Sequence, residues 1–172
     1  MKRLIGSVTL LLVLCCYMWS CEKDDLCATD TPTTPSLLIE FYASDNPAAP
    51  NPVTNLRYFV EGSKDTIFIK GSAAKIRVPL RVDGTSTKWG LILYTNPNGV
   101  DTYNTDFLEF KYTTTQVYVS RACGFKTLFK LDDPTAPNPV LTDGDKTLWI
   151  DEADIVNTNV ETEEKAHVKI YF

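Results

Sequence analysis

The chain has 172 residues, and its 17 basic and 22 acidic side chains give it a formal net charge of −5. An acidic balance argues against binding to nucleic acid or to anionic lipid headgroups, because both need a basic surface. The length suits one domain with a hydrophobic core, and the lack of a repeat of about 20–50 residues excludes solenoids and propellers.

Residues 1–20 have the layout of a secretory signal peptide. Two basic residues are followed by a mostly apolar run, and the small Ser20 stands just before Cys21. A membrane-spanning helix is the alternative, but it needs about 20 apolar residues, and this run is shorter and is interrupted by glycine, serine and threonine. We therefore expect residues 1–20 to be removed, which leaves 15 basic and 22 acidic residues and a net charge of −7.

Cys21 is the expected lipidation site. The residues before it, Met18-Trp19-Ser20, resemble a loose lipobox of the bacterial lipoproteins of the Bacteroidetes type of envelope, in which the cysteine is acylated as the signal is cut. More than one buried acyl chain would anchor the protein stably, because each buried methylene contributes about 0.8 kcal/mol. A structural cysteine at this position is the alternative.

The charged segment after Cys21 is expected to be a solvated tether. It consists of Glu22, Lys23, Asp24 and Asp25. The segment resembles the export signal of Bacteroidetes-type surface lipoproteins. That resemblance implies a lipid-anchored protein of the outer membrane on the cell surface, with the periplasmic face of the same membrane as the alternative.

Cys27 and Cys123 are the two cysteines that remain outside the signal and the anchor. Two thiols in an exported domain predict a disulfide. Closing a loop of about 100 residues would stabilise the fold by roughly 4–5 kcal/mol in the chain-entropy description. A metal or redox pair is the alternative, but the chain has no Cys-x-x-Cys and only one histidine.

Strand patterns dominate the chain after an extended, threonine- and proline-rich spacer at 28–35. The clearest strand is 75–82, whose apolar and polar residues alternate, and Pro79 predicts that it lies at a sheet edge or carries a bulge. Only 151–155 could form a helical turn, and 132–145 is turn material. The other expected strands span 37–42, 56–60, 66–70, 87–95, 107–112, 117–122, 125–131, 148–150, 154–160 and 166–172.

These patterns predict an all-β fold, an antiparallel β-sandwich of the immunoglobulin-like or jelly-roll-like kind with about eight to ten short strands. A closed barrel is the alternative. The expected organisation is a signal peptide at 1–20, a lipidated tether at 21–35 and a single sandwich domain at 36–172.

Several short segments resemble an uncharacterised family of Bacteroidetes-type lipoproteins, a domain of unknown function. They are the cysteine-flanked segment 21–27, Thr34-Pro35 before the first strand, Ser120 to Phe125, and the terminal Val168 to Phe172. The resemblance covers nearly all of residues 21–172. It implies a location and a β fold, and it implies no activity.

Catalytic candidates are few. His167 lies in the last strand and is expected to face solvent with Lys169 and Tyr171, without a placed catalytic partner. No Gly-x-Ser-x-Gly, phosphate loop or dinucleotide fingerprint is present. Paired carboxylates could hydrolyse glycosides, but ordinary turns contain them too; they are Asp132-Asp133, Asp143, Asp145, Asp151-Glu152, Glu161, Glu163 and Glu164.

Two other groups of side chains could bind a ligand. Asp101, Asn104 and Asp106, together with Asp143 and Asp145, offer calcium-type oxygen ligands but lack the spacing of the 12-residue calcium loop. An aromatic set could stack on sugars, although Trp89 and Trp149 are expected in the core; the set also contains Tyr94, Tyr103, Tyr112 and Tyr118. Asp65-Thr66-Ile67 resembles a short O-glycosylation acceptor of exported Bacteroidetes-type proteins.

The sequence therefore predicts a cell-envelope lipoprotein with a non-enzymatic structural, assembly or interaction role and no cofactor. A surface module that binds glycan or protein is the alternative, and a carboxylate-based hydrolase ranks below both. The expected partners are the membrane, through the lipid anchor, and an envelope protein or a glycan, but not nucleic acid.

Overall fold

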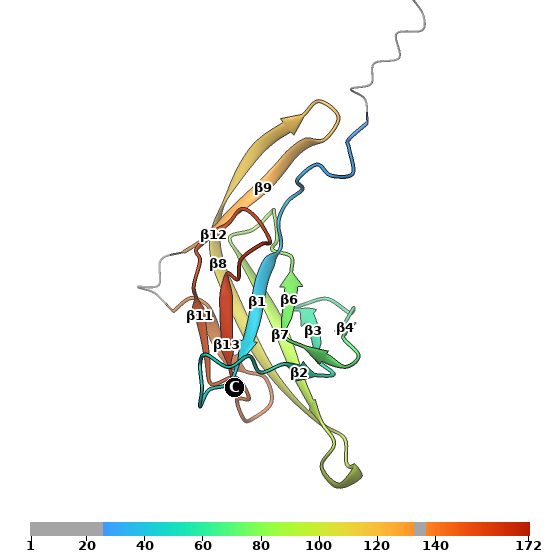
Figure 1. The fold of residues 1–172 in the computed structure, drawn as a ribbon, viewed down its shortest axis with the longest axis vertical. Coiled ribbons are helices and arrows are strands. Elements are labelled where there is room, and N and C mark those ends of the chain that lie inside the picture. The colour runs from blue at the N-terminus through green and yellow to red at the C-terminus, as the bar shows by residue number, and fades with distance from the viewer. Residues whose placement is uncertain (1–25, 133–136) are drawn as a thin grey trace, which may run out of the picture. The chain divides into compact units, whose positions relative to one another are not determined.

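The structure is a computed structural model that describes residues 26–132 and 137–172. Its regular elements are β-strands and one short 3-10 helix, η2 (Pro97–Gly99) (Figure 1). The predicted signal peptide, Cys21 and the segment Glu22 to Asp25 lie outside the described residues. Among the described residues, no helix has the length and apolar character needed to cross a membrane.

The chain divides into two compact units. The smaller one, called here the stapled unit, combines the chain up to Thr31 with Tyr118–Phe125. The larger one, called here the sandwich, comprises Pro32–Val117 and Lys126–Phe172. The expected tether at 21–35 is therefore divided, with the residues up to Thr31 in the stapled unit and those from Pro32 in the sandwich. Pro35 is buried in the sandwich, and Thr34 Oγ1 accepts a hydrogen bond from Thr127 N at 3.0 Å.

A four-stranded sheet forms one layer of the sandwich. Its strand order is β11 (Glu152–Ile155), β13 (Val168–Tyr171), β1 (Leu37–Tyr42) and β6 (Lys75–Val78). The first and last strands of the domain pair in parallel, with Ile39 opposite Val168 and Phe41 opposite Ile170. The other two pairings are antiparallel, so the predicted antiparallel sandwich contains one parallel junction, between β1 and β13.

A seven-stranded sheet forms the other layer, with the order β12-β9-β8-β7-β3-β4 and β10 paired to β8 (Figure 1). The strands are β3 (Arg57–Val60), β4 (Ile67–Phe68), β7 (Ser86–Thr95), β8 (Thr102–Ser120), β9 (Gly124–Leu131), β10 (Val140–Asp143) and β12 (Asn159–Val160). A separate pair joins β2 (Val53–Thr54) to β5 (Ser72–Ala73).

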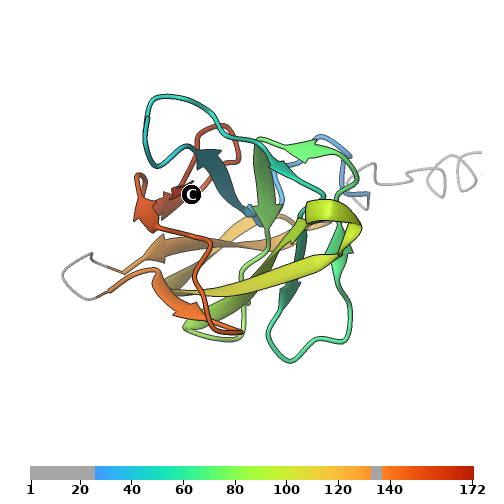
Figure 2. The same cartoon turned by 90° about the horizontal axis from the view of Figure 1, so that it is seen from below.

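The hydrophobic core lies between the inward faces of the two sheets, which Figure 2 shows from below as curled layers. Alternation places every second residue of a strand on this face. Trp89 and Trp149 are both core residues, as predicted. The all-β sandwich expected from the sequence is therefore confirmed. The largest fully buried side chains include Tyr112, Phe41, Phe110, Leu37, Leu56, Leu108 and Ile150.

Several secondary-structure predictions differ from the structure. The expected strands 107–112 and 117–122 are parts of the single strand β8, because the threonines between them favour extended backbone and no glycine or proline interrupts it. The expected turn 132–145 contains β10, which pairs with β8. The expected strand 148–150 is absent and 151–155, the one candidate helical turn, is mostly strand β11, because pairing with β13 decides its conformation.

The edge position predicted from Pro79 is confirmed. Strand β6 is the outermost strand of its sheet and pairs only with β1. It ends at Val78, directly before the proline, which has no backbone N–H to donate to a ladder. The Pro79 carbonyl instead accepts the indole N–H of Trp89 at 3.2 Å, so the strand end holds a core tryptophan in place.

The prediction that His167 faces solvent is wrong, since its side chain is 1% exposed. Its ring Nδ1 accepts the backbone N–H of Leu38 at 3.0 Å, and its own backbone N–H donates to the Leu38 carbonyl at 2.9 Å. Alternation places His167 on the same face as Lys169, but the ring is held against β1 by the hydrogen bond from Leu38 N–H. Burial lowers the pKa of His167, and the charge of Glu163 and a backbone hydrogen bond with Thr162 oppose that shift.

We expect acid to destabilise the fold through His167. Its folded pKa lies below the value of 6.5 for an exposed histidine, so below pH 6.5 the unfolded chain binds a proton that the folded chain does not. Stability should therefore fall as the pH drops through this window, by at most about 1.4 kcal/mol per pH unit for one proton. His167→Asn keeps an acceptor for Leu38 N–H. The free energy of unfolding, measured with urea at pH 7 and at pH 5, should fall less between these two pH values for this variant than for the wild type. An equal fall contradicts the assignment.

Two aromatic rings of the seven-stranded sheet, Phe59 and Phe107, pack against two glycines. Phe59 and Phe107 meet edge to face with ring centroids 5.8 Å apart, directly over Gly90. A Cβ on Gly144 would lie 2.6 Å from the Thr105 carbonyl oxygen and 2.7 Å from Phe107 Cε2. Because one of these clashes is with backbone, the β8–β10 junction has no room for a side chain at Gly144.

We expect Gly144→Ala to destabilise the sandwich by about 1–3 kcal/mol, the usual cost of overpacking. Gly84→Ala is the matched control, because a Cβ there would meet its nearest atom at an ordinary 3.6 Å. Urea unfolding followed by tryptophan emission measures both variants. Equal stability of the two would show that the junction relaxes around the new methyl group.

Candidate functional site

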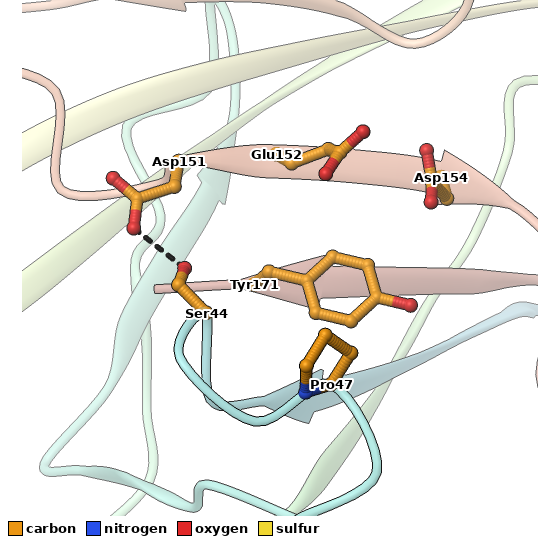
Figure 3. Close-up of a pocket in the computed structure, with 6 residues that line it drawn as sticks. All are labelled: Ser44, Pro47, Asp151, Glu152, Asp154 and Tyr171. Carbon is orange, nitrogen blue, oxygen red and sulfur yellow. Dashed lines mark hydrogen bonds between the residues drawn. The ribbon is translucent and has the colours of Figure 1, made fainter.

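An acidic hollow of about 430 Å³ on the sandwich is the candidate site (Figure 3). Its walls come from β11, from the end of β13 and from the loop after β1. The lining residues are Ser44, Pro47, Asp151, Glu152, Asp154 and Tyr171. Every residue except the half-buried Tyr171 is exposed, so the hollow is an open surface feature.

Strand register builds the hollow. Glu152 and Asp154 lie two positions apart on β11, so their side chains leave the same face of the sheet. Across the ladder, Glu152 is opposite Tyr171 and Asp154 is opposite Lys169. One end is closed by the loop after β1, where Ser44 Oγ donates a hydrogen bond to Asp151 Oδ2 at 2.5 Å.

A pair of tyrosines continues the outward face beside the hollow. Tyr42 and Tyr171 are neighbours in the parallel pairing, with ring centroids 6.0 Å apart and planes inclined by 41°. Lys169 Nζ lies 4.5 Å from the centre of the Tyr42 ring. Tyr42 donates to Glu40 at 2.9 Å, and this hydrogen bond raises the pKa of Tyr42, with smaller contributions from burial and from the nearby charges.

The hollow can attract a cationic group through its three carboxylates and can donate a hydrogen bond from the Tyr171 hydroxyl. Burial and then the carboxylates of Asp154 and Glu152 raise the pKa of Tyr171, so its hydroxyl remains a donor at neutral pH. Glycoside hydrolysis requires one carboxyl group kept protonated and another kept ionised by distinct surroundings. All three carboxylates of the hollow are exposed to solvent.

The predicted calcium ligands are brought together by the sheet. Asp106 on β8 is opposite Asp143 on β10. Asp145 Oδ2 accepts Thr105 N at 2.8 Å, and Asp143 Oδ1 accepts two N–H groups of its own turn. These oxygens therefore accept hydrogen bonds from backbone N–H groups. Among residues 26–132 and 137–172, no group of three or more Asp, Glu, His or Cys side chains is placed to hold a metal ion.

Asp106 is a buried carboxylate that holds the loop before β11. Its Oδ2 accepts the backbone N–H groups of Trp149 and Ile150, each at 2.8 Å. Its Oδ1 and the buried Oδ1 of Asn104 have no hydrogen-bond partner in the described residues. Two such oxygens fall short of the roughly six to eight that calcium takes, and burial raises the pKa of Asp106 against the lowering effect of the two backbone donors.

The remaining candidate carboxylates that the structure describes do not line the hollow. Glu163 forms an ion pair with Arg77 at 2.8 Å and accepts Ser36 N at 2.7 Å; the backbone bond to Ser36 is the main reason that its pKa is lowered. Glu161 and Glu164 are exposed. Asp132 is exposed at the end of β9, and Asp133 lies outside the described residues.

The aromatic candidates do not form a flat stacking platform. Tyr112 is 1% exposed and belongs to the core. Tyr94 and Tyr103 lie on the sandwich with their planes inclined by 45°, whereas Tyr118 lies in the stapled unit. Thr66, the glycosylation candidate, is exposed beside β4.

The structure joins Cys27 and Cys123 by a disulfide, with the two Cα atoms 4.9 Å apart. Cys21 and the charged segment Glu22 to Asp25 lie outside the described residues. Among the predicted site residues in the described part of the chain, only Cys27 and Cys123 are covalently joined.

Ser44, Pro47 and Tyr171 were not predicted as site residues. Alternation along 166–172 places Lys169 and Tyr171 on one face, and this pattern could have marked the tyrosine as an outward residue. No pattern in the sequence places the loop containing Ser44 beside Asp151, because that contact depends on the pairing of the first and last strands.

We expect Asp106→Ala to destabilise the fold strongly, because two buried N–H groups lose their acceptor at about 1–3 kcal/mol each. Asp106→Asn keeps an acceptor oxygen and should cost less. Asp154→Ala, an exposed carboxylate, should change stability by less than about 0.5 kcal/mol. Urea unfolding at pH 7 measures all three variants, and equal stability of the alanine and asparagine variants would disprove the role of the two hydrogen bonds.

Comparison with known proteins places the chain in a family. A search of curated proteins and a search of solved structures each found no match. The family of unknown function DUF6452 matches residues 55–172, which include strands β3 to β13 and four of the residues that line the hollow, but not Ser44 or Pro47. The chain therefore belongs to the DUF6452 family.

Proposed function

We propose that the protein is an exported, lipid-anchored protein of the outer membrane with a non-enzymatic structural, assembly or interaction role. The observation that carries this proposal is the order of features at the start of the chain: a signal-like segment, Cys21 after a small residue, a charged run, and Cys27. An exported location is consistent with the disulfide between Cys27 and Cys123, because disulfides persist in oxidising compartments.

The anchor would be an acylated Cys21. The residues before it match the loose lipobox of Bacteroidetes-type lipoproteins, and more than one acyl chain gives stable membrane attachment. The run Glu22 to Asp25 resembles the surface-export signal of that type of envelope, which supports the cell surface over the periplasmic face.

A non-enzymatic role is supported by the chemistry of the sandwich. The single histidine of the chain is buried and accepts a backbone N–H. The buried carboxylate Asp106 also serves backbone donors. The carboxylates that do meet at a surface hollow are exposed. The groups that could do acid–base work are thus either engaged in the fold or open to water.

The alternative proposal is a surface module that binds glycan or protein. Its best location is the acidic hollow, where Tyr171 supplies a half-buried ring beside three carboxylates. The inclined planes of Tyr42 and Tyr171 favour a protein contact over flat stacking on a sugar ring. Affinity capture from intact envelopes would favour the assembly role if outer-membrane proteins co-purify, and a specific glycan-array signal that Tyr171→Ala abolishes would favour the alternative.

We expect Cys21→Ala to abolish acylation and membrane attachment. Cells fed an alkyne fatty acid should label the wild-type protein, and the variant should remain unlabelled and leave the membrane fraction. Cys16→Ala is the matched control, because that cysteine lies within the segment expected to be removed. Equal labelling of wild type and Cys21→Ala would refute the anchor. For the wild-type protein, protease treatment of intact cells would distinguish the cell surface from the periplasmic face.

A further inference from the structure

We propose that the stapled unit carries a membrane-contact surface that rests in the headgroup region of a zwitterionic lipid bilayer. The surface consists of Leu26, Tyr118, Phe125 and Arg121. The inference rests on the proposed anchor at Cys21 and names a second, non-covalent contact with the same membrane.

Large apolar side chains are exposed together in this unit. Leu26 is 86% exposed, Tyr118 59% and Phe125 66%, which is unusual for three such residues in so short a stretch of structure. The rings of Tyr118 and Phe125 pack edge to face with centroids 5.4 Å apart, so one apolar patch spans the two strands of the β8–β9 hairpin.

Side-chain chemistry points to a bilayer interface. A tyrosine has an apolar ring and a polar hydroxyl, and aromatic residues gather at the level of the lipid headgroups for this reason. Leu26 and Tyr118 line a hollow of about 470 Å³ together with Arg121, whose guanidinium has no carboxylate within 4.0 Å in the described part of the chain. An arginine beside apolar groups suits the phosphate of a lipid headgroup.

The short segment between Cys21 and Cys27 limits how far this patch can lie from the proposed anchor. Cys27 lies six residues after Cys21, and six extended residues reach at most about 22 Å. The disulfide binds Cys27 to Cys123 in the hairpin turn. Tyr118 and Phe125 flank that turn, so an acylated Cys21 would hold both rings within reach of the membrane surface whatever conformation the tether adopts.

Charge selects the kind of lipid. Residues 21–172 carry a net charge of −7, and three of their acidic residues, Glu22, Asp24 and Asp25, follow the proposed anchor directly. Repulsion therefore disfavours anionic headgroups, whereas a zwitterionic headgroup offers Arg121 a phosphate without a net opposing field. The proposed partner is therefore a phosphatidylcholine- or phosphatidylethanolamine-type surface.

The test uses the processed chain, residues 21–172, coupled through Cys21 to vesicles. These residues contain three cysteines, of which the disulfide uses two, so Cys21 reacts alone with a maleimide lipid in phosphatidylcholine vesicles. Phe125→Trp places a reporter in the patch, and acyl-chain bromination quenches a tryptophan that enters the bilayer. Tyr103→Trp, at a residue 46% exposed on the sandwich, is the control.

Emission is compared with that of the unsubstituted chain, whose Trp89 and Trp149 are buried. The expected result is an added, blue-shifted emission in Phe125→Trp that brominated lipid quenches, with Tyr103→Trp emission unchanged by bromination. Cys27→Ser combined with Cys123→Ser should reduce the Phe125→Trp quenching, because the hairpin turn is then no longer tied to the anchor. Emission from Phe125→Trp that is the same in brominated and unbrominated vesicles would overturn the inference, as would equal quenching at both reporter positions.

A second copy of the chain is the competing occupant. If the uncoupled protein is a dimer by light scattering, and Tyr118→Ser with Phe125→Ser makes it a monomer, the patch is a subunit interface and the membrane contact is refuted. Chemical coupling makes these outcomes independent of acylation in cells, so failure of this inference and failure of the proposed anchor are distinguishable.

Discussion

The parallel pairing of β1 with β13 is the interaction on which the sandwich depends most. It brings the first and last strands of the domain together in the middle of the four-stranded sheet. His167 locks this junction from the side, because its ring accepts the Leu38 N–H while its backbone pairs with the Leu38 carbonyl. Everything that lies on that sheet, including the acidic hollow, follows from this register.

Ligand-like side chains are used to hold loops in this fold. Asp106, Asp143 and Asp145 resemble a set of metal ligands in sequence, and the β8–β10 pairing does bring them near one another. Their oxygens nevertheless accept backbone N–H groups. A buried N–H without an acceptor is costly, so a loop that runs through the core at Trp149 needs an internal acceptor such as Asp106.

The stapled unit contains the disulfide that would connect the proposed anchor to the β8–β9 turn. A tether of six residues between the proposed anchor and Cys27 is short, and the disulfide transmits that restraint to the β8–β9 turn. Exposed apolar residues on a protein surface are usually scattered. Here Leu26, Tyr118 and Phe125 lie together on the segment that the proposed anchor would keep closest to lipid, which gives the exposure of these three residues a physical reason.

The sequence by itself determined the all-β class, the core positions of Trp89 and Trp149 and the edge position of the strand before Pro79, because alternation and proline chemistry act locally. Only the tertiary structure decided the burial of His167, the parallel β1–β13 pairing and the meeting of Ser44 with Asp151. These features join residues more than 100 positions apart, and no local pattern records which distant strand or loop will cover a given face.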